Sequence, residues 1–252
     1  MGTLDGQVAL VTGAGRGIGA GIASALARAG ARVVVNYRSS RREAEGVVDR
    51  LAEEGCEAMA VEADVTDEQA VARMMDRTLE RYSRLDVLVN NAGLALDAPF
   101  LEMTRNMWDD VLRANLTGTF VCSQAAARIM LRQGRGKIIN IGASTGIRGR
   151  RNGANYCAAK GGVLALTKAM AHDLAPAVTV NALCPGFVPT KDVVDRFGLD
   201  DPAAVRRMLD QIPMGRLANF DDVGAAAVFL AGPGSDYITG QLLFVNGGMF
   251  MY

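Results

Sequence analysis

Short apolar runs alternate with longer amphipathic segments along almost the whole chain. The runs are rich in β-branched residues and bounded by glycine or polar residues, which is typical of buried strands. They cover residues 8–11, 33–37, 57–61, 87–89, 137–141, 178–183 and 242–245. The pattern predicts an α/β fold in which helices cover both faces of a doubly wound, parallel, seven-stranded sheet. We expect a single domain over residues 1–252.

Helices are predicted where polar capping residues precede an apolar repeat of helical spacing. Residues 40–43 (Ser-Arg-Arg-Glu) and 66–69 (Thr-Asp-Glu-Gln) have the spacing of capping boxes. The helices that they open should run to about Glu54 and Tyr82. Two longer helical regions cover roughly residues 106–132 and the stretch from Ala154 to Leu174.

One segment interrupts this alternation. Between Pro185 and Asp221, prolines and glycines surround short helical pieces, directly after a predicted strand. Folds of this class place ligand-covering lids at the carboxyl ends of strands. We therefore expect a substrate lid at about residues 187–217, and a surface excursion without a binding role is the alternative.

A glycine-rich turn over residues 12–19 joins the first predicted strand to the first helix. Backbone N–H groups and the dipole at a helix N-terminus favour an anion. Glycines let the chain turn tightly and approach a pyrophosphate without a Cβ in the way. The strand-turn-helix context predicts a nucleotide-binding site, whereas an isolated glycine cluster would be equally compatible with an ordinary tight turn.

Tyr156 and Lys160 lie one helical turn apart, on the same face of a predicted helix. A free tyrosine loses its proton near pH 10, and a neighbouring lysine favours the phenolate, which lowers the pKa toward neutrality. The pair thus suits proton transfer. Taken alone, the same spacing is common on solvated helix surfaces, so its meaning depends on the other motifs.

Composition and charge exclude several classes of function. The chain has 27 basic and 27 acidic residues in 252, which gives no support for nucleic acid or an anionic membrane as a partner. No apolar stretch approaches the roughly 20 residues that span a bilayer, and no signal peptide is visible, so we expect a cytoplasmic protein. The scattered cysteines indicate free thiols. The single histidine, His172, cannot build a metal site alone, and we expect no metal.

The chain also contains, in this order, the motifs Thr12-Gly13-x-x-x-Gly17-Ile18-Gly19, Asp64-Val65, Asn90-Asn91-Ala92-Gly93, Asn115, Tyr156-x-x-x-Lys160 and Pro185-Gly186-x-x-x-Thr190. In their order and spacing these motifs resemble the short-chain dehydrogenase/reductase family, from about Leu4 to the end of the chain. The closing residues 245–249 (Val-Asn-Gly-Gly-Met) resemble the 3-oxoacyl-(acyl-carrier-protein) reductase branch. The resemblance implies a Rossmann fold, a nicotinamide cofactor and a homotetramer that assembles through two long helices and the C-terminal strand.

The resemblance also implies roles for the matching residues. Tyr156 would protonate the substrate carbonyl oxygen, Lys160 would hold the nicotinamide ribose and lower the Tyr156 pKa, and Asn115 would hold a water that links Lys160 to solvent. The other cofactor contacts would come from Gly13, Arg16, Gly17, Ile18, Gly19, Asn36, Arg38, Ser39, Asp64, Val65, Asn91, Ala92, Gly93, Pro185, Gly186, Val188 and Thr190.

Charge near the end of the second predicted strand indicates the cofactor. Enzymes that prefer NAD usually place an acidic residue there to bind the ribose 2′-hydroxyl. Here the position is Asn36, with Arg38 two residues later and Arg16 inside the glycine turn. Two guanidinium groups without a carboxylate suit a 2′-phosphate. We therefore predict NADPH.

The sequence departs from the family at the catalytic serine, which normally lies thirteen residues before the tyrosine. Counting back from Tyr156 gives Ala143, and a serine follows at Ser144. Three interpretations stay open. A local register shift could let Ser144 bind the carbonyl oxygen, as a catalytic residue. The chain could instead be a Ser→Ala variant with weakened turnover, or it could bind cofactor for another purpose.

The substrate is less well defined than the chemistry. Reductases of this branch tend to carry basic residues that dock an acidic carrier protein, but the loop at residues 175–177 is short and uncharged. We predict an NADPH-dependent carbonyl reductase acting on a 3-oxoacyl thioester or related ketone, carried by acyl carrier protein, by coenzyme A or by neither. The alternatives are an NAD(P)-dependent alcohol dehydrogenase of the same family and a catalytically weakened NADPH-binding member with a regulatory or assembly role.

Overall fold

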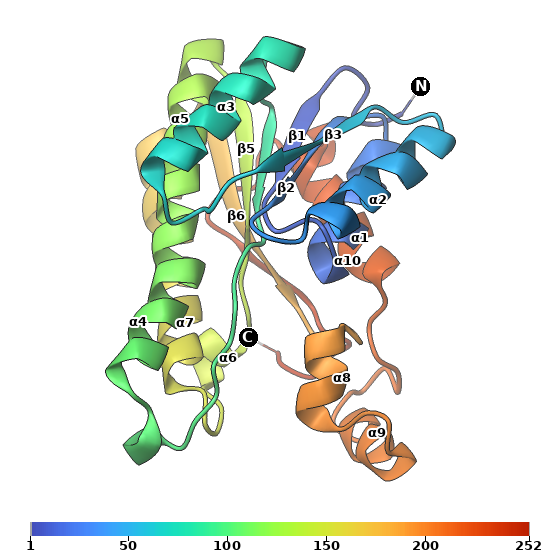
Figure 1. Ribbon diagram of the computed structural model, residues 1–252, viewed down its shortest axis with the longest axis vertical. Helices are drawn as coiled ribbons and strands as arrows, with labels where there is room; N and C mark the ends of the chain where they lie inside the picture. The colour runs from blue at the N-terminus through green and yellow to red at the C-terminus, as the bar shows by residue number, and fades with distance from the viewer. Residues whose placement is uncertain (1, 252) are drawn as a thin grey trace.

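A parallel sheet of seven strands forms the centre of the protein in a computed structural model that describes residues 2–251 (Figure 1). The strand order is β3-β2-β1-β4-β5-β6-β7. The strands are β1 (Val8–Val11), β2 (Arg32–Tyr37), β3 (Ala58–Glu62), β4 (Val87–Asn90), β5 (Gly136–Ile141), β6 (Val178–Pro185) and β7 (Leu242–Val245). The predicted doubly wound fold is confirmed, with small differences at the strand ends.

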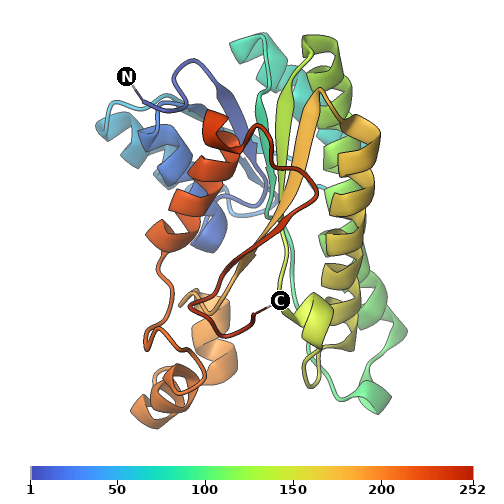
Figure 2. The ribbon, with the colours of Figure 1, turned by 180° about the vertical axis from the view of Figure 1, so that it is seen from behind.

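Helices cover both faces of the sheet, as Figures 1 and 2 show from opposite sides. One face carries α1 (Gly17–Arg28), α2 (Arg41–Glu53) and α10 (Phe220–Ala231). The other face carries α3 (Glu68–Tyr82), α5 (Gly118–Gln133) and α7 (Ala154–Leu174). Shorter helices are α4 (Arg105–Leu112), α6 (Thr145–Arg148), α8 (Lys191–Phe197) and α9 (Pro202–Leu209).

Two apolar clusters, one on each face of the sheet, make up most of the core. Ile22 and Leu26 of α1 and Leu230 of α10 pack against one face and are almost fully buried. Met74 of α3 and Met130 of α5 pack against the other. Strands buried on both faces explain why their sequences are continuous apolar runs rather than alternating ones.

The two predicted helix caps differ from those observed. Ser40 precedes α2, but its side chain makes no capping hydrogen bond, so the predicted capping box is wrong. At α3 the capping residue is Asp67 rather than Thr66, and its carboxylate accepts from the N–H groups of Gln69 and Ala70. Aspartate caps as well as serine or threonine, so the start of the helix shifts by one residue.

The long helical region predicted at 106–132 is continuous but not uniform. Between α4 and α5, residues Arg113–Thr117 form a π-helical turn. Such turns are rare and occur frequently at functional sites. Of the two helices that sequence reasoning did not assign, α6 follows β5 and α10 follows the expected lid segment.

The order of the strands fixes where a ligand can bind. The chain winds outward in both directions from β1 and its neighbour β4, so the loops after these strands diverge at the carboxyl edge of the sheet. Open α/β sheets bind ligands in the crevice at this point. In both views α8 and α9 project from the same end of the sheet as α4 and α6 (Figures 1 and 2).

Candidate active site

The glycine turn after β1 forms a tight backbone cradle at the start of α1. Gly13 and Gly17 have φ values of +61° and +59°, which other residues rarely adopt. A Cβ at Gly19 would lie 2.4 Å from Asn91 Nδ2 and 2.6 Å from the Gly13 carbonyl oxygen. No side chain caps α1 at Arg16, which leaves the first backbone N–H groups to an anion. This cradle fits the pyrophosphate of a dinucleotide.

Thr12 and Asn91 lock the glycine turn to the loop after β4. The Thr12 hydroxyl accepts hydrogen bonds from the backbone N–H groups of Asn91 and Ala92, at 2.9 and 3.0 Å. In return, Asn91 Nδ2 donates to the carbonyl oxygens of Thr12 and Gly13. Asn91, which is predicted to contact the cofactor, therefore also sets the shape of the cradle.

Asn36 lies at the end of β2 as predicted, but its amide is occupied by the fold. Its Oδ1 accepts from the Gly13 N–H at 3.1 Å, and its Nδ2 donates to the carbonyl oxygens of Tyr37, Val61 and Ala63. The residue is 1% exposed. The structure thus gives Asn36 a positioning role, because any effect on a cofactor would pass through Gly13.

Arg16 and Arg38, the cations predicted to favour a 2′-phosphate, are both exposed near the cradle. Arg38 lies 3.8 Å from Asp64, which also accepts hydrogen bonds from the backbone N–H and hydroxyl of Thr66. With 63% of its side chain exposed, Arg38 is free to turn toward a ligand. Ser39 is exposed beside it.

The segment that is predicted to form a lid begins beside the glycine turn. A Cβ at Gly17 would lie 3.3 Å from Thr190 Cγ2, and the Thr190 hydroxyl caps α8 by accepting from the Val193 N–H. At Gly186 a Cβ would lie 2.7 Å from the Asn246 Cα, so the chain passes too close for a side chain. Residues Pro185 to Thr190 are thereby placed beside the cradle, with Val188 buried.

Tyr156 and Lys160 are on one face of α7, next to the end of β5. Lys160 Nζ donates to the Ile141 carbonyl oxygen at 2.7 Å and lies 5.7 Å from the centre of the Tyr156 ring. Lys160 is 5% exposed. Helix α7 also packs closely against α6, where a Cβ at Gly146 would lie 2.6 Å from the Gly161 backbone nitrogen.

The acid–base properties of the pair differ from the prediction. Burial lowers the pKa of Lys160 to about 8. Burial raises the pKa of the Tyr156 phenol, and the guanidinium groups of Arg150 and Arg196 oppose that increase. The sequence predicts a lowered tyrosine pKa caused by Lys160. The structure gives the opposite direction, because the loss of hydration outweighs the nearby cations.

Asn115 lies in the π-helical turn and is buried. Its Nδ2 donates to the carbonyl oxygens of Leu94 and Val111, which ties the loop after β4 to the helix. A Cβ at Gly93 would lie 2.3 Å from Asn115 Oδ1, so this contact requires glycine. The motif residues at 90–93 and at 115 are therefore brought together, although they are far apart in sequence.

Ala143 and Ser144 follow the end of β5, whose pairing with β6 continues to Ile141. Ala143 is half-buried, whereas Ser144 is 4% exposed and makes no hydrogen bond through its hydroxyl within residues 2–251. Ala143 is the more exposed of the two residues. No contact with a substrate tests the predicted role of Ser144, which stays a prediction.

Charged residues that sequence reasoning missed surround Tyr156. Arg150, on the connection between α6 and α7, lies with its guanidinium carbon 5.1 Å from the centre of the Tyr156 ring. Both of its terminal nitrogens contact the carboxylate of Asp97, and Arg196 of α8 lies 3.6 Å from the same carboxylate. The only feature of the sequence that indicates these charged residues is the arginine-rich stretch at 148–151.

Comparison with known proteins agrees with this geometry. A family model described as enoyl-(acyl carrier protein) reductase matches residues 13–250. A 3-oxoacyl-(acyl-carrier-protein) reductase of Synechocystis sp. is 44% identical over 254 residues, and the match spans the whole of both proteins. The chain belongs to the short-chain dehydrogenase/reductase family. As a member of this family it is an oxidoreductase that uses a nicotinamide cofactor.

Further short-chain dehydrogenases/reductases are similar to the chain over nearly its full length. The FabG 3-oxoacyl-(acyl-carrier-protein) reductase of Staphylococcus aureus is 44% identical and covers 96% of this chain and 98% of its own. A gluconate 5-dehydrogenase from Burkholderia cenocepacia, solved with NADP and tartrate, has a TM-score of 0.92 and 39% identity, covering 98% of this chain and 96% of that one.

No helix in residues 2–251 is long and apolar enough to cross a membrane. The same residues contain no cluster of histidine, cysteine or acidic side chains that could hold a metal ion, and their cysteines are free.

Proposed function

We propose that the protein is an NADPH-dependent carbonyl reductase that converts a 3-oxoacyl thioester or a related ketone into the secondary alcohol. One observation carries this proposal. The Tyr156–Lys160 pair, with Lys160 fixed on the end of β5, stands at the same edge of the sheet as a cradle that fits a dinucleotide. Full-length similarity to proteins named as 3-oxoacyl-(acyl-carrier-protein) reductases supports the substrate class.

In this proposal Tyr156 is the proton donor. The reduced nicotinamide, when bound, supplies the hydride that forms the new C–H bond at the carbonyl carbon. The Tyr156 hydroxyl gives its proton to the carbonyl oxygen, and the resulting phenolate takes a replacement proton through Lys160 and the water predicted at Asn115. A raised phenol pKa suits this direction, because the phenol keeps its proton until the substrate oxygen becomes basic.

The preference for NADPH is proposed from charge. Arg16 and Arg38 stand beside the cradle, and the buried amide of Asn36 occupies the position where enzymes that prefer NAD place a carboxylate. A 2′-phosphate would make charge-assisted hydrogen bonds with either guanidinium. Structural neighbours solved with NADP support the same choice.

We propose that Ala143 occupies the position from which a serine hydroxyl would make the second hydrogen bond to the carbonyl oxygen. Ala143 is accessible and Ser144 is buried, which supports the interpretation that a hydroxyl is missing and that turnover is weakened. In that case Tyr156 alone would donate to the oxygen.

The second candidate function is an NAD(P)-dependent alcohol dehydrogenase that works in the opposite direction. The structural neighbours named as gluconate 5-dehydrogenases favour it, because they share the fold at 39% and 40% identity.

For assembly, we propose a homotetramer formed partly through α5. Phe120 and Leu131 on that helix are 45% and 48% exposed, which supports a covered apolar face.

The experiment that tests the proposed function is NADPH oxidation with a panel of ketones. Acetoacetyl-coenzyme A, an acetoacetyl carrier protein and a simple 3-oxo ester would be compared under the same conditions. We expect turnover with at least one of them, and oxidation of the matching alcohols with NADP⁺ at a lower rate. Tight NADPH binding without turnover of any ketone or alcohol would contradict the proposal and favour a regulatory or assembly role.

A further inference from the structure

Three charged side chains from separate parts of the chain meet beside Tyr156. Asp97 comes from the loop after β4, Arg150 from the α6–α7 connection and Arg196 from α8 of the lid. Their side chains are 24%, 17% and 31% exposed, so the group is shielded but still open to solvent. An ion-pair cluster of this kind differs from a solvated surface pair, because partial burial strengthens the electrostatic interactions of each charge.

Local contacts hold the three residues in place. The Ala98 N–H donates to the Asn152 carbonyl oxygen at 2.9 Å, which fixes the Asp97 loop to the segment that carries Arg150. A Cβ at Gly153 would lie 2.7 Å from the Arg150 Cζ, so the glycine makes room for the guanidinium. At the lid, the ring of Phe197 packs edge-on against Phe187, with the ring centres 5.1 Å apart.

The charges in this cluster do not balance. Two guanidinium groups share one carboxylate, which leaves one positive charge in excess. Arg150 directs both terminal nitrogens to Asp97, whereas Arg196 lies at 3.6 Å and makes no hydrogen bond through its guanidinium within residues 2–251. The unused donors of Arg196, and the remaining ones of Arg150, match the geometry of a second carboxylate.

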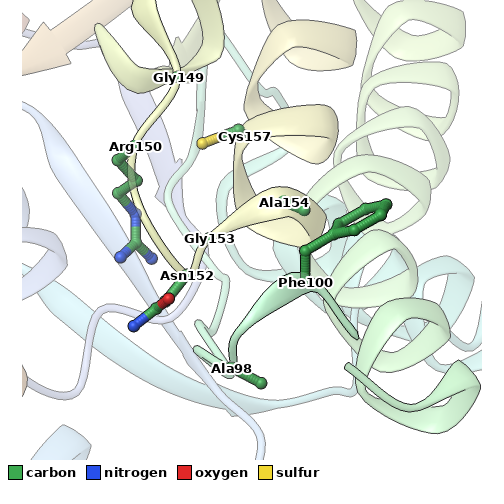
Figure 3. Close-up of a pocket in the computed structure, with 8 residues that line it drawn as sticks. All are labelled: Ala98, Phe100, Gly149, Arg150, Asn152, Gly153, Ala154 and Cys157. Atoms are coloured by element: carbon green, nitrogen blue, oxygen red, sulfur yellow. The ribbon is translucent and has the colours of Figure 1, made fainter. Parts of the chain in front are cut away.

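The excess charge is directed at the reacting group. Arg150 covers the Tyr156 ring, and both arginines act electrostatically on its phenol. A pocket of about 320 Å³ opens at the same connection, and it is lined by Arg150, Asn152, Phe100 and Cys157 among others but not by Tyr156 or Arg196. Figure 3 shows the side chains of Arg150 and Asn152 extending to one side of the connecting loop and Phe100 lying on the other.

We propose that Arg150 and Arg196, held by Asp97, form a subsite for a carboxylate that lies close to the carbonyl group being reduced. The inference rests on the proposed function, because it specifies the related ketone that the same site would take: a short oxo acid, in preference to its neutral ester. The phosphates of a coenzyme A or carrier-protein thioester lie far from the reacting carbonyl, so they do not meet the requirement for proximity to Tyr156.

The test compares acetoacetate with its neutral methyl ester. Binding to the protein loaded with NADP⁺ is measured by calorimetry, since no reduction takes place with the oxidised cofactor, and turnover with NADPH is measured separately. We expect acetoacetate to bind more tightly than the ester. Arg196→Gln should weaken acetoacetate binding about tenfold to a hundredfold and leave the ester nearly unchanged, as for a lost hydrogen bond to a charged group.

Two further variants sharpen the result. Arg150→Lys keeps the charge but loses the planar fork, so it should weaken acetoacetate binding less than Arg150→Gln does. Arg151→Gln is the matched control, because Arg151 is exposed on the same connection and makes no ion pair within residues 2–251. This variant should change the binding of neither acetoacetate nor its methyl ester. Melting temperatures show whether each variant is folded.

Equal binding of acetoacetate and its ester to the unaltered protein would overturn the subsite, as would an equal effect of Arg196→Gln on both ligands. The proposed function can fail separately. If no ketone oxidises NADPH while acetoacetate binds in the arginine-dependent manner described, the reductase assignment is wrong and the carboxylate subsite stands.

Discussion

The Lys160 ammonium group donates a hydrogen bond of 2.7 Å to the carbonyl oxygen of Ile141, the last residue of β5. This bond ties the helix that carries Tyr156 and Lys160 to the edge of the sheet where the cofactor is expected to bind. It also replaces part of the hydration that Lys160 loses on burial. Within residues 2–251 no carboxylate pairs with the buried ammonium group, and its pKa is lowered to about 8.

The pKa of Lys160 makes stability depend on pH in a defined direction. In the unfolded chain the amine keeps its proton up to its ordinary pKa of 10.5, so between about pH 8 and 10.5 the unfolded state binds more protons at this site. The free energy of unfolding contributed by Lys160 therefore rises with pH. In urea unfolding of the cofactor-free protein, the free energy of unfolding of the unaltered protein should increase relative to that of Lys160→Met from about pH 7.5 to about pH 9.5. Parallel curves would contradict the lowered pKa.

Asn36 is expected to support both forms of the cofactor equally. Asn36→Ala removes an acceptor from Gly13 and a donor from Val61 and Ala63, which leaves buried backbone groups unpaired. We expect a loss of about 2–3 kcal/mol in the free energy of unfolding. Affinities for NADPH and NADH, measured by fluorescence titration, should fall by the same factor. A fall confined to NADPH would mean that Asn36 contacts the 2′-phosphate directly.

Arg38 is expected to discriminate between the cofactors. Arg38→Leu should weaken NADPH binding by about tenfold to a hundredfold and leave NADH nearly unchanged, since only NADPH carries the 2′-phosphate. Arg41→Leu is a suitable control, because Arg41 is exposed at the start of α2 and pairs with Glu45. If Arg38→Leu weakens the binding of NADPH and NADH alike, the preference for NADPH comes from another residue.

Ala143 is expected to limit the rate of reduction. Ala143→Ser should raise kcat with an acetoacetyl thioester by about 10²–10³, because it restores a donor to the carbonyl oxygen. Ser144→Ala, one residue later and buried, should change kcat little. The reverse pattern, in which Ser144→Ala abolishes turnover and Ala143→Ser has no effect, would identify Ser144 as the donor.

Much of the fold follows from local sequence. Continuous β-branched runs separated by amphipathic segments can be satisfied only by a parallel sheet covered on both faces, and that sheet is present. Helix starts were less predictable. Ser40 occupies the N-cap position of α2, but its hydroxyl makes no capping hydrogen bond, and at α3 the neighbouring Asp67 caps the helix in place of Thr66.

The charged surroundings of Tyr156 could not be predicted. Asp97, Arg150 and Arg196 are far apart in sequence, and only the packing of the lid and two loops brings them together. The predicted direction of the Tyr156 pKa change was wrong for the same reason. Helical spacing places Lys160 near the ring, but the degree of burial, which dominates, is a property of the folded protein.

The central claim is that Tyr156 gives the proton to the carbonyl oxygen. The most direct measurement is single-turnover oxidation of bound NADPH by an acetoacetyl thioester, comparing the unaltered protein with Tyr156→Phe. Loss of the hydroxyl should slow the reaction by about 10²–10⁴ and leave the dissociation constant for NADPH unchanged. A Tyr156→Phe protein that oxidises NADPH at the original rate would contradict the account.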